Sequence, residues 1–137
     1  MGTTVAAVGL TIGCSDDEGA SEATGPVAAG NVSAVAVGSV AAVGGKPVIL
    51  GRDDKGLYAL SAICTHEQCD ISSSGTIAAS GINCSCHGSK FSATGDVKQG
   101  PATSPLKHFK VDLGADGSIT IQAGTVVDAA QRTAVPA

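Results

Sequence analysis

The chain has 137 residues, enough for one domain, of which 43% are hydrophobic and 15% charged. Its net charge of −4 and its eight scattered Lys and Arg residues argue against a nucleic-acid partner, because phosphate binding needs clustered basic side chains. The aromatic residues are Tyr58, Phe91 and Phe109 alone, so the core must consist mainly of small aliphatic side chains. A core this thin usually needs a disulfide or a metal to stabilise it.

Residues 1–14 have features of an export signal. The apolar run of residues 5–12 is too short to span a bilayer, which takes about 20 apolar residues, so we expect no transmembrane helix. A basic n-region is missing, but small residues leading to Cys14 are typical of a bacterial lipoprotein signal, in which the cysteine is lipidated. The alternative is an apolar N-terminus with an unmodified Cys14. The signal predicts an extracytoplasmic protein, either secreted or lipid-anchored at the outer face of the cell membrane through Cys14.

Residues 15–31 are predicted to form a flexible acidic linker. Four acidic residues lie there among Gly, Ala, Ser and Thr: Asp16, Asp17, Glu18 and Glu22. A segment of this composition buries too little apolar surface to fold.

Residues 32–123 are predicted to form a single all-β domain, because short apolar runs alternate with turn residues and no helical period appears. Residues 46–52 and 57–63 flank a hairpin turn at residues 53–56, where Gly56 can adopt positive φ. Residues 108–113 and 118–121 alternate apolar with polar side chains, as half-buried strands do. Residues 124–137 give no clear signal and are expected to be a C-terminal tail.

His108 and the Asp53–Asp54 pair are predicted to have structural roles and no catalytic role. His108 is predicted to point outward from its strand, beside Lys107 and Lys110. Asp53 and Asp54 are predicted to form a solvated turn. No pair of carboxylates indicates acid–base catalysis.

Residues 64–105 form a loop-rich stretch that is too long to remain structureless inside a compact domain. This stretch contains four of the five cysteines and two of the three histidines. Something other than apolar packing must therefore order it.

The cysteines and histidines fall into two boxes, residues 64–69 and residues 84–89. The first begins Cys64-Thr65-His66, and the second, after seventeen intervening residues, begins Cys84-Ser85-Cys86-His87. A structural zinc site is a weaker interpretation, because zinc sites favour C-x-x-C and H-x-x-x-H pairs. Two disulfides would leave the histidines unexplained.

The two boxes resemble those of Rieske proteins, and the additional cysteine in each box resembles the high-potential class. The resemblance implies a small antiparallel sandwich with a loop-rich cluster-binding subdomain and one [2Fe–2S] cluster. It assigns Cys64 and Cys84 to one iron and His66 and His87 to the other. Neutral imidazoles carry less negative charge than thiolates, which raises the reduction potential to roughly −150 to +300 mV.

The same resemblance implies that a disulfide between Cys69 and Cys86 joins the two boxes, which favours an oxidising compartment. It also implies that Ser89 donates a hydrogen bond to a cluster sulfide and so raises the potential. The alternative is an ordinary turn serine.

Two further positions bear on tuning of the cluster. Phe91 occupies the position of a tyrosine in the most oxidising members, and it lacks the hydroxyl that would bond a ligand cysteine. Gly100-Pro101 resembles the proline loop that covers the third side of the cluster.

The expected function is one-electron transfer outside the cytoplasm between redox partner proteins, with no independent catalysis. One alternative is the Rieske subunit of a cytochrome bc complex or of another periplasmic oxidoreductase, such as one resembling arsenite oxidase. Glu67 stands where quinol-oxidising members have a bulky apolar residue, and burying a carboxylate in an apolar pocket is costly, which weakens the quinol alternative. Another alternative is a metal-stabilised binding domain with no redox role.

Overall fold

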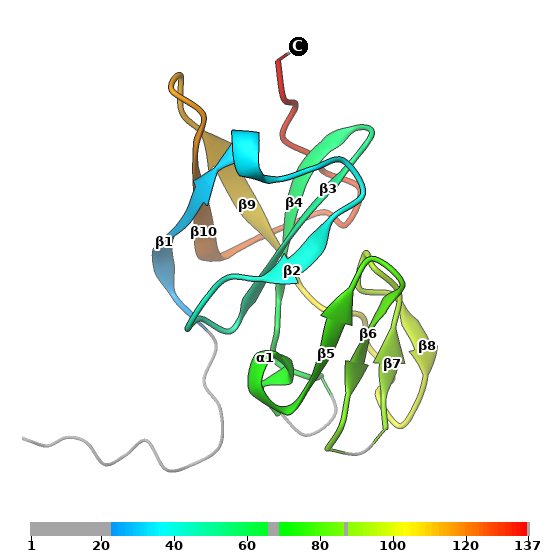
Figure 1. Ribbon diagram of the computed structural model, residues 1–137. Helices are drawn as coiled ribbons and strands as arrows, with labels where there is room; N and C mark the ends of the chain where they lie inside the picture. Colours follow the sequence, from blue (N-terminus) through cyan, green and yellow to red (C-terminus); the bar gives the residue numbers. More distant parts are fainter. Residues whose placement is uncertain (1–22, 66–68, 87, 137) are drawn as a thin grey trace, which may run out of the picture.

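The computed structural model describes residues 23–65, 69–86 and 88–136, and its elements are almost all strands (Figure 1). In chain order they are β1 (Gly25–Asn31), the 3-10 turn η2 (Val32–Ala34), β2 (Val40–Ala42), β3 (Val48–Asp53), β4 (Gly56–Ser61), α1 (Ile71–Ser74), β5 (Gly75–Ala78), β6 (Gly81–Cys84), β7 (Lys90–Phe91), β8 (Val97–Gln99), β9 (His108–Leu113) and β10 (Ser118–Val127). The prediction of an all-β fold is confirmed.

Six strands form an antiparallel sheet in the order β1-β10-β9-β4-β3-β2, here called the base sheet. The predicted hairpin is its β3–β4 pair, which closes with Asp53 opposite Gly56. The Asp53 carboxylate accepts hydrogen bonds from the N–H groups of Lys55 and Gly56 and so fixes the turn. The predicted strands at residues 108–113 and 118–121 are β9 and the first part of β10.

Residues 62–107 lie between β4 and β9 and form an inserted subdomain. Its four strands pair antiparallel in the order β5-β6-β7-β8, and α1 precedes them. Although the insertion is long, β4 and β9 are neighbours in the base sheet, where Leu60 is opposite His108. A hydrogen bond from Ser61 N to Lys107 O, 2.9 Å long, closes the base of the insertion.

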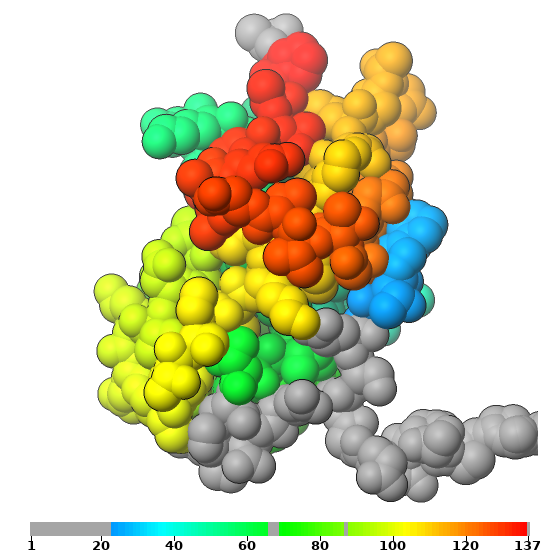
Figure 2. All heavy atoms as spheres, turned by 180° about the vertical axis from the view of Figure 1, so that it is seen from behind, coloured from blue at the N-terminus to red at the C-terminus, as the bar shows by residue number. Residues whose placement is uncertain are grey.

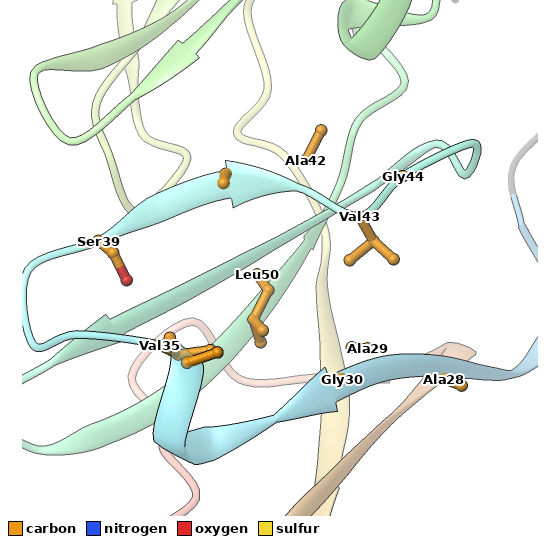
Figure 3. A pocket seen from close by; sticks show the side chains of 11 residues that line it. Ala28, Ala29, Gly30, Val35, Ser39, Ala42, Val43, Gly44 and Leu50 are labelled. Carbon is orange, nitrogen blue, oxygen red and sulfur yellow. The ribbon is translucent and has the colours of Figure 1, made fainter.

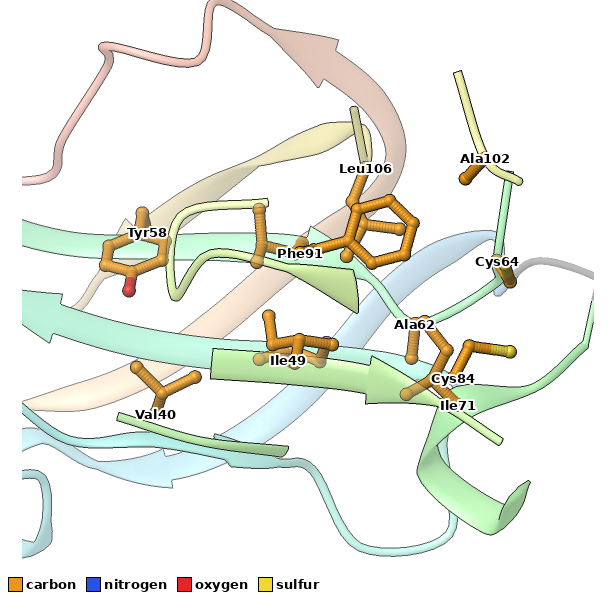
Figure 4. Close-up of a cluster of buried hydrophobic side chains, with 12 residues drawn as sticks. Val40, Ile49, Tyr58, Ala62, Cys64, Ile71, Cys84, Phe91, Ala102 and Leu106 are labelled. Carbon is orange, nitrogen blue, oxygen red and sulfur yellow. The ribbon is translucent and has the colours of Figure 1, made fainter. Parts of the chain in front are cut away.

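Every residue of β4 is buried, because this strand has apolar side chains packed against both of its faces. Leu57 and Ala59 belong to a core formed within the base sheet by β1, β3, β9 and β10. Tyr58 and Leu60 belong to a second core, which the base sheet shares with the inserted subdomain (Figure 4). Cys64 and Cys84 are part of this shared core, so the packing of the two sheets fixes the positions of both cysteines.

The structured part of the chain begins earlier than predicted. Residues 25–31, assigned to the flexible linker, form strand β1, which pairs with β10 and places Val27 opposite Ile121. The side-chain pattern did not indicate this strand, because Val27 is its one buried residue and β1 is held mainly by backbone hydrogen bonds. Pro26 is tolerated because β1 is an edge strand.

The predicted C-terminal tail is also part of the fold. Strand β10 continues to Val127, and Thr133 then pairs with Leu57 through two backbone hydrogen bonds of 2.8 and 2.9 Å. Arg132 Nε donates to Asp53 Oδ2 at 2.7 Å, so Asp53 is not simply a solvated turn residue. Seen from behind, the segment after β10 crosses the base sheet (Figure 2).

A groove of about 460 Å³ lies where the edge strands β1 and β2 face each other (Figure 3). Small side chains such as Ala28, Ala29 and Ala42 line it, with Leu50 at its floor. Among the described residues that line the groove, none is titratable, and the Ser39 hydroxyl already donates to Ala36 O at 2.6 Å. The groove therefore offers no set of groups for catalysis.

Candidate metal centre

The first box follows directly from strand β4. The chain leaves β4 at Ser61 and reaches Cys64, which is only 2% exposed. Cys64 N donates to Cys69 O at 2.8 Å, and Ile71 N donates to Ala62 O at 2.7 Å. These two bonds close residues 64–69 into a loop whose ends are fixed.

The second box begins at the end of β6 and repeats this arrangement. Cys84, also 2% exposed, donates its N–H to Ser89 O at 2.8 Å, five residues later, as Cys64 does in the first box. Gly88 N donates a hydrogen bond to Cys84 O at 3.1 Å. The positive φ of Gly88, 83°, allows the chain to turn back here. Each box is therefore a closed loop that starts with a buried cysteine.

A disulfide between Cys69 and Cys86 joins the two loops, as the resemblance implied. The sulfur atoms of Cys69, Cys84 and Cys86 all lie within 4.8 Å of one another. Because two of these sulfurs are bonded to each other, the reduced thiols of the two boxes are those of Cys64 and Cys84. His66, Glu67 and His87 lie outside the described residues.

The proline loop is held against both boxes. Ala102 N donates to Ser89 Oγ at 3.0 Å, and both residues are buried. Gln99 Nε2 donates to Gly88 O at 3.0 Å, and Thr65 Oγ1 donates to Ser104 O at 2.7 Å. Gly100 and Pro101, joined by a cis peptide bond, lie between these anchors. The roles of Gln99 and Thr65 were not predicted, because neither residue belongs to the pattern of cysteines and histidines.

Ser89 has no exposed surface, and its hydroxyl accepts the Ala102 N–H. That bond does not use the hydroxyl proton, which remains available for donation, as an interaction with a cluster sulfide requires. Phe91, 1% exposed, packs in the shared core with Leu106 (Figure 4).

The described cysteines have the chemistry that a [2Fe–2S] cluster requires. Two buried thiols from two separate loops match the two thiolates that one iron of a Rieske centre requires, and the other two cysteines of the boxes are bonded to each other. The sequence places one histidine between the ends of each loop. These residues fit the group.

The prediction for His108 is wrong. This residue is only 3% exposed, and its Nε2 is 2.8 Å from Thr94 O, inside the junction between the base sheet and the inserted subdomain. Its ring centroid is 6.0 Å from that of Tyr58, whose hydroxyl donates to Ala93 O at 2.9 Å. Strand β9 is covered on both faces here, so alternation within the strand did not indicate which side chains are exposed.

Three side chains of the base sheet, those of His108, Asp53 and Tyr58, have a shifted pKa. Burial lowers the pKa of His108, and the bond to Thr94 O opposes this effect. Burial alone would raise the pKa of Asp53, but hydrogen bonds and the Arg132 charge lower it overall. Burial raises the pKa of Tyr58, whose ring lies 4.5 Å from the Arg132 guanidinium carbon.

The membrane predictions concern the N-terminus, and Cys14 lies outside the described residues. Within the described part of the chain, no helix has the length and apolar character needed to cross a membrane.

The family model of the Rieske [2Fe–2S] domain matches residues 25–110. The chain is 40% identical over 74 residues to the cytochrome b6-f complex iron-sulfur subunit of Chlorobaculum tepidum, covering 54% of this chain and 39% of that protein. It is 38% identical over 76 residues to the same subunit of Synechococcus sp. (strain WH7803), covering 55% and 41%. The chain thus spans less than half the length of these relatives.

Two solved structures agree with the fold. The plasma membrane Rieske protein of the cyanobacterium Synechocystis superposes with a TM-score of 0.52 and 25% identity, covering 71% of this chain and 99% of that one. The ferredoxin of Sphingomonas yanoikuyae B1 superposes with a TM-score of 0.50 and 26% identity, covering 70% and 96%.

Proposed function

The chain belongs to the Rieske [2Fe–2S] family, and from this we propose that it transfers single electrons between redox proteins outside the cytoplasm, with Cys64, His66, Cys84 and His87 as the iron ligands. A [2Fe–2S] cluster held by these residues would take up and release one electron at a potential of roughly −150 to +300 mV. The observation that carries the proposal is the pair of matching loops, each of which starts with a buried, reduced cysteine and is joined to the other by the Cys69–Cys86 disulfide.

The surrounding residues have distinct tasks in this proposal. The shared core and the proline loop keep water from the two thiolates, because Cys64, Cys84 and Ala102 are almost fully buried. The disulfide keeps the two loops together. The Ser89 hydroxyl would donate a hydrogen bond to a cluster sulfide, while Phe91 has no hydroxyl to donate, so the potential would lie below that of members with both hydroxyls.

The disulfide supports an oxidising compartment. We therefore propose that the protein acts at the outer face of the cell membrane, tethered there through lipidated Cys14. Mass spectrometry of the membrane fraction should find the lipid on Cys14, and Cys14→Ser should release the protein from membranes. Lipid-free Cys14 in a membrane-bound protein would contradict the tether.

We propose that the partner is a redox protein that contacts the two boxes. A carrier role is supported by the likeness to a ferredoxin, 96% of whose chain is covered. The second candidate, a subunit of a cytochrome bc-type complex, is favoured by the b6-f relatives. It is disfavoured by Glu67, which stands where quinol-oxidising members have a bulky apolar residue. Affinity capture from membranes separates them, because only a subunit should co-purify with cytochromes.

The ligand set is tested with four single variants: Cys64→Ser, His66→Ala, Cys84→Ser and His87→Ala. Each should abolish the visible and electron paramagnetic resonance spectra of the cluster, because each removes one of four ligands. Cys14→Ser and His108→Gln are matched controls and should keep both spectra. Full iron content with an unchanged spectrum in any of the four variants would refute the assignment.

A further inference from the structure

Three sulfur atoms from the two boxes are crowded into one place. Those of Cys69, Cys84 and Cys86, here called the sulfur triad, all lie within 4.8 Å of one another, and Cys69 and Cys86 share a disulfide. We propose that in the cluster-free chain Cys84 exchanges with this disulfide, so that the triad is a thiol–disulfide exchange site.

The exchange needs no oxidant. The Cys84 thiolate attacks Cys69 Sγ, the Cys69–Cys84 bond forms, and the Cys69–Cys86 bond breaks. Cys86 leaves with the bonding electron pair and takes up a proton from water, which balances the proton that Cys84 gave up. One disulfide is present before and after, and no electron is gained or lost.

The position of each sulfur determines which bond forms. Attack on Cys86 would join two cysteines separated only by Ser85 and would close a very small ring. Attack on Cys69 instead joins the second box to the first, as the original disulfide does. It also releases Cys86, whose side chain is at least partly exposed, so water can solvate the departing thiolate.

Cys64 provides a matched comparison within the same molecule. Like Cys84 it is 2% exposed, begins a box and is in no disulfide, but it is not a member of the sulfur triad. Burial and reduction are therefore shared by both cysteines, and only Cys84 lies within 4.8 Å of both disulfide sulfurs as a member of the sulfur triad.

The exchange matters for the cluster, and this consequence rests on the proposed ligand set. Iron bonded to Cys84 removes the attacking group and protects the Cys69–Cys86 disulfide. Once the iron is lost, exchange places a ligand sulfur in a disulfide, and the empty site cannot accept a cluster until that bond is reduced or reset. The triad thus couples cluster occupancy to disulfide connectivity.

The test begins with the full chain carrying its cluster, whose spectra first check the proposed function independently. Iron is then chelated and removed with the released sulfide by desalting without oxygen, and thiols are alkylated at intervals. Trypsin would leave all four box cysteines in one peptide, because no Lys or Arg lies between Lys55 and Lys90. Cleavage before Asp70 separates Cys69 from Cys84, and fragment ions then distinguish Cys84 from Cys86.

The loaded chain should show the Cys69–Cys86 crosslink. The cluster-free chain should gain a Cys69–Cys84 crosslink with alkylated Cys86, while the number of alkylated thiols stays constant. Cys64→Ser and Cys84→Ser are expected to carry no cluster, so they are analysed as purified: Cys64→Ser should contain the Cys69–Cys84 crosslink, and Cys84→Ser should keep the Cys69–Cys86 crosslink. A persistent Cys69–Cys86 crosslink with alkylated Cys84 would overturn the proposal, as would a Cys64–Cys84 crosslink with two fewer thiols, since that product requires oxidation.

Discussion

His108 is held in its neutral form by its surroundings. Its Nε2–H donates to Thr94 O, and within the described part of the chain its Nδ1 has no hydrogen-bond partner. A buried ring with one unpaired nitrogen resists gaining a proton, because the charged form would lose its hydration. The pKa of His108 is accordingly lowered in the folded protein.

The lowered pKa of His108 predicts a loss of stability at mildly acidic pH. The unfolded state binds the proton first, at a pKa of about 6.5, so the free energy of unfolding should decrease as pH falls from about 7 towards 5. His108→Gln can still donate to Thr94 O but does not titrate, so its unfolding should lose this part of the pH dependence. Denaturant unfolding at several pH values measures the difference, and identical slopes for both proteins would contradict the prediction.

Ser89 connects the second box to the proline loop, and its removal should affect both stability and potential. Ser89→Ala leaves the buried Ala102 N–H without its acceptor, which should lower the free energy of unfolding by about 1–3 kcal/mol. It should also lower the reduction potential, because the proposed hydrogen-bond donor to the cluster is lost. Denaturant unfolding and voltammetry measure the two effects. Ser85→Ala, at an exposed position in the same box, should change neither.

At the scale of elements, the hairpin β3–β4 could be predicted because its turn has a specific chemistry. Asp53 and Gly56 close the turn, and uninterrupted apolar runs flank it. Strand β1 could not be predicted in the same way, because Gly25, Pro26 and Gly30 are residues that usually interrupt strands. Its pairing with β10 depends on a partner almost a hundred residues away.

The two boxes are elements that apolar packing alone does not hold. The Cys69–Cys86 disulfide, with a sequence separation of 17, should contribute about 3 kcal/mol to stability. The double variant Cys69→Ser/Cys86→Ser should therefore assemble a cluster that bleaches faster on heating. Visible absorbance followed during thermal unfolding provides the measurement, and an unchanged bleaching temperature would show that the disulfide does not stabilise the loops.

For the whole molecule, the cysteines and histidines of the two boxes predicted the family, the cofactor and the disulfide. Their spacing is a chemical requirement of the cluster, so it is visible in the sequence. The supports contributed by Gln99, Thr65 and His108 were not visible, because each bonds a backbone carbonyl. Every residue provides such a carbonyl, so nothing in the sequence marks the partner.

The segment after β10 should prove necessary for the stability of the base sheet. Deleting residues 128–137 removes the acceptor of the fully buried Leu57 N–H and should lower the free energy of unfolding by at least about 1–3 kcal/mol. Denaturant unfolding provides the measurement, and an unchanged midpoint would show that residues 128–137 do not stabilise the fold.

Arg132→Gln removes the ion pair with Asp53 but keeps the backbone hydrogen bonds of residues 128–137. Because the pKa of Asp53 is lowered in the folded protein, the ion pair stabilises the fold above about pH 4 and is lost as pH falls further. The variant should therefore lose stability at neutral pH but resemble the parent near pH 2. An equal difference at both pH values would exclude a contribution from the charge of Asp53.

The insertion between β4 and β9 has a consequence for how this architecture can change in length. The chain leaves the base sheet at Ser61 and returns at Lys107, two residues joined by a hydrogen bond, so the strand pairing needs these ends to meet and the shared core needs a subdomain that covers Tyr58 and Leu60. Loop-closure entropy grows slowly, by about 0.6 kcal/mol for each doubling of length. Subdomains of different sizes that cover the same face could therefore replace the insertion, and residues added to its exposed turns should be tolerated far better than insertions within the strands of the base sheet.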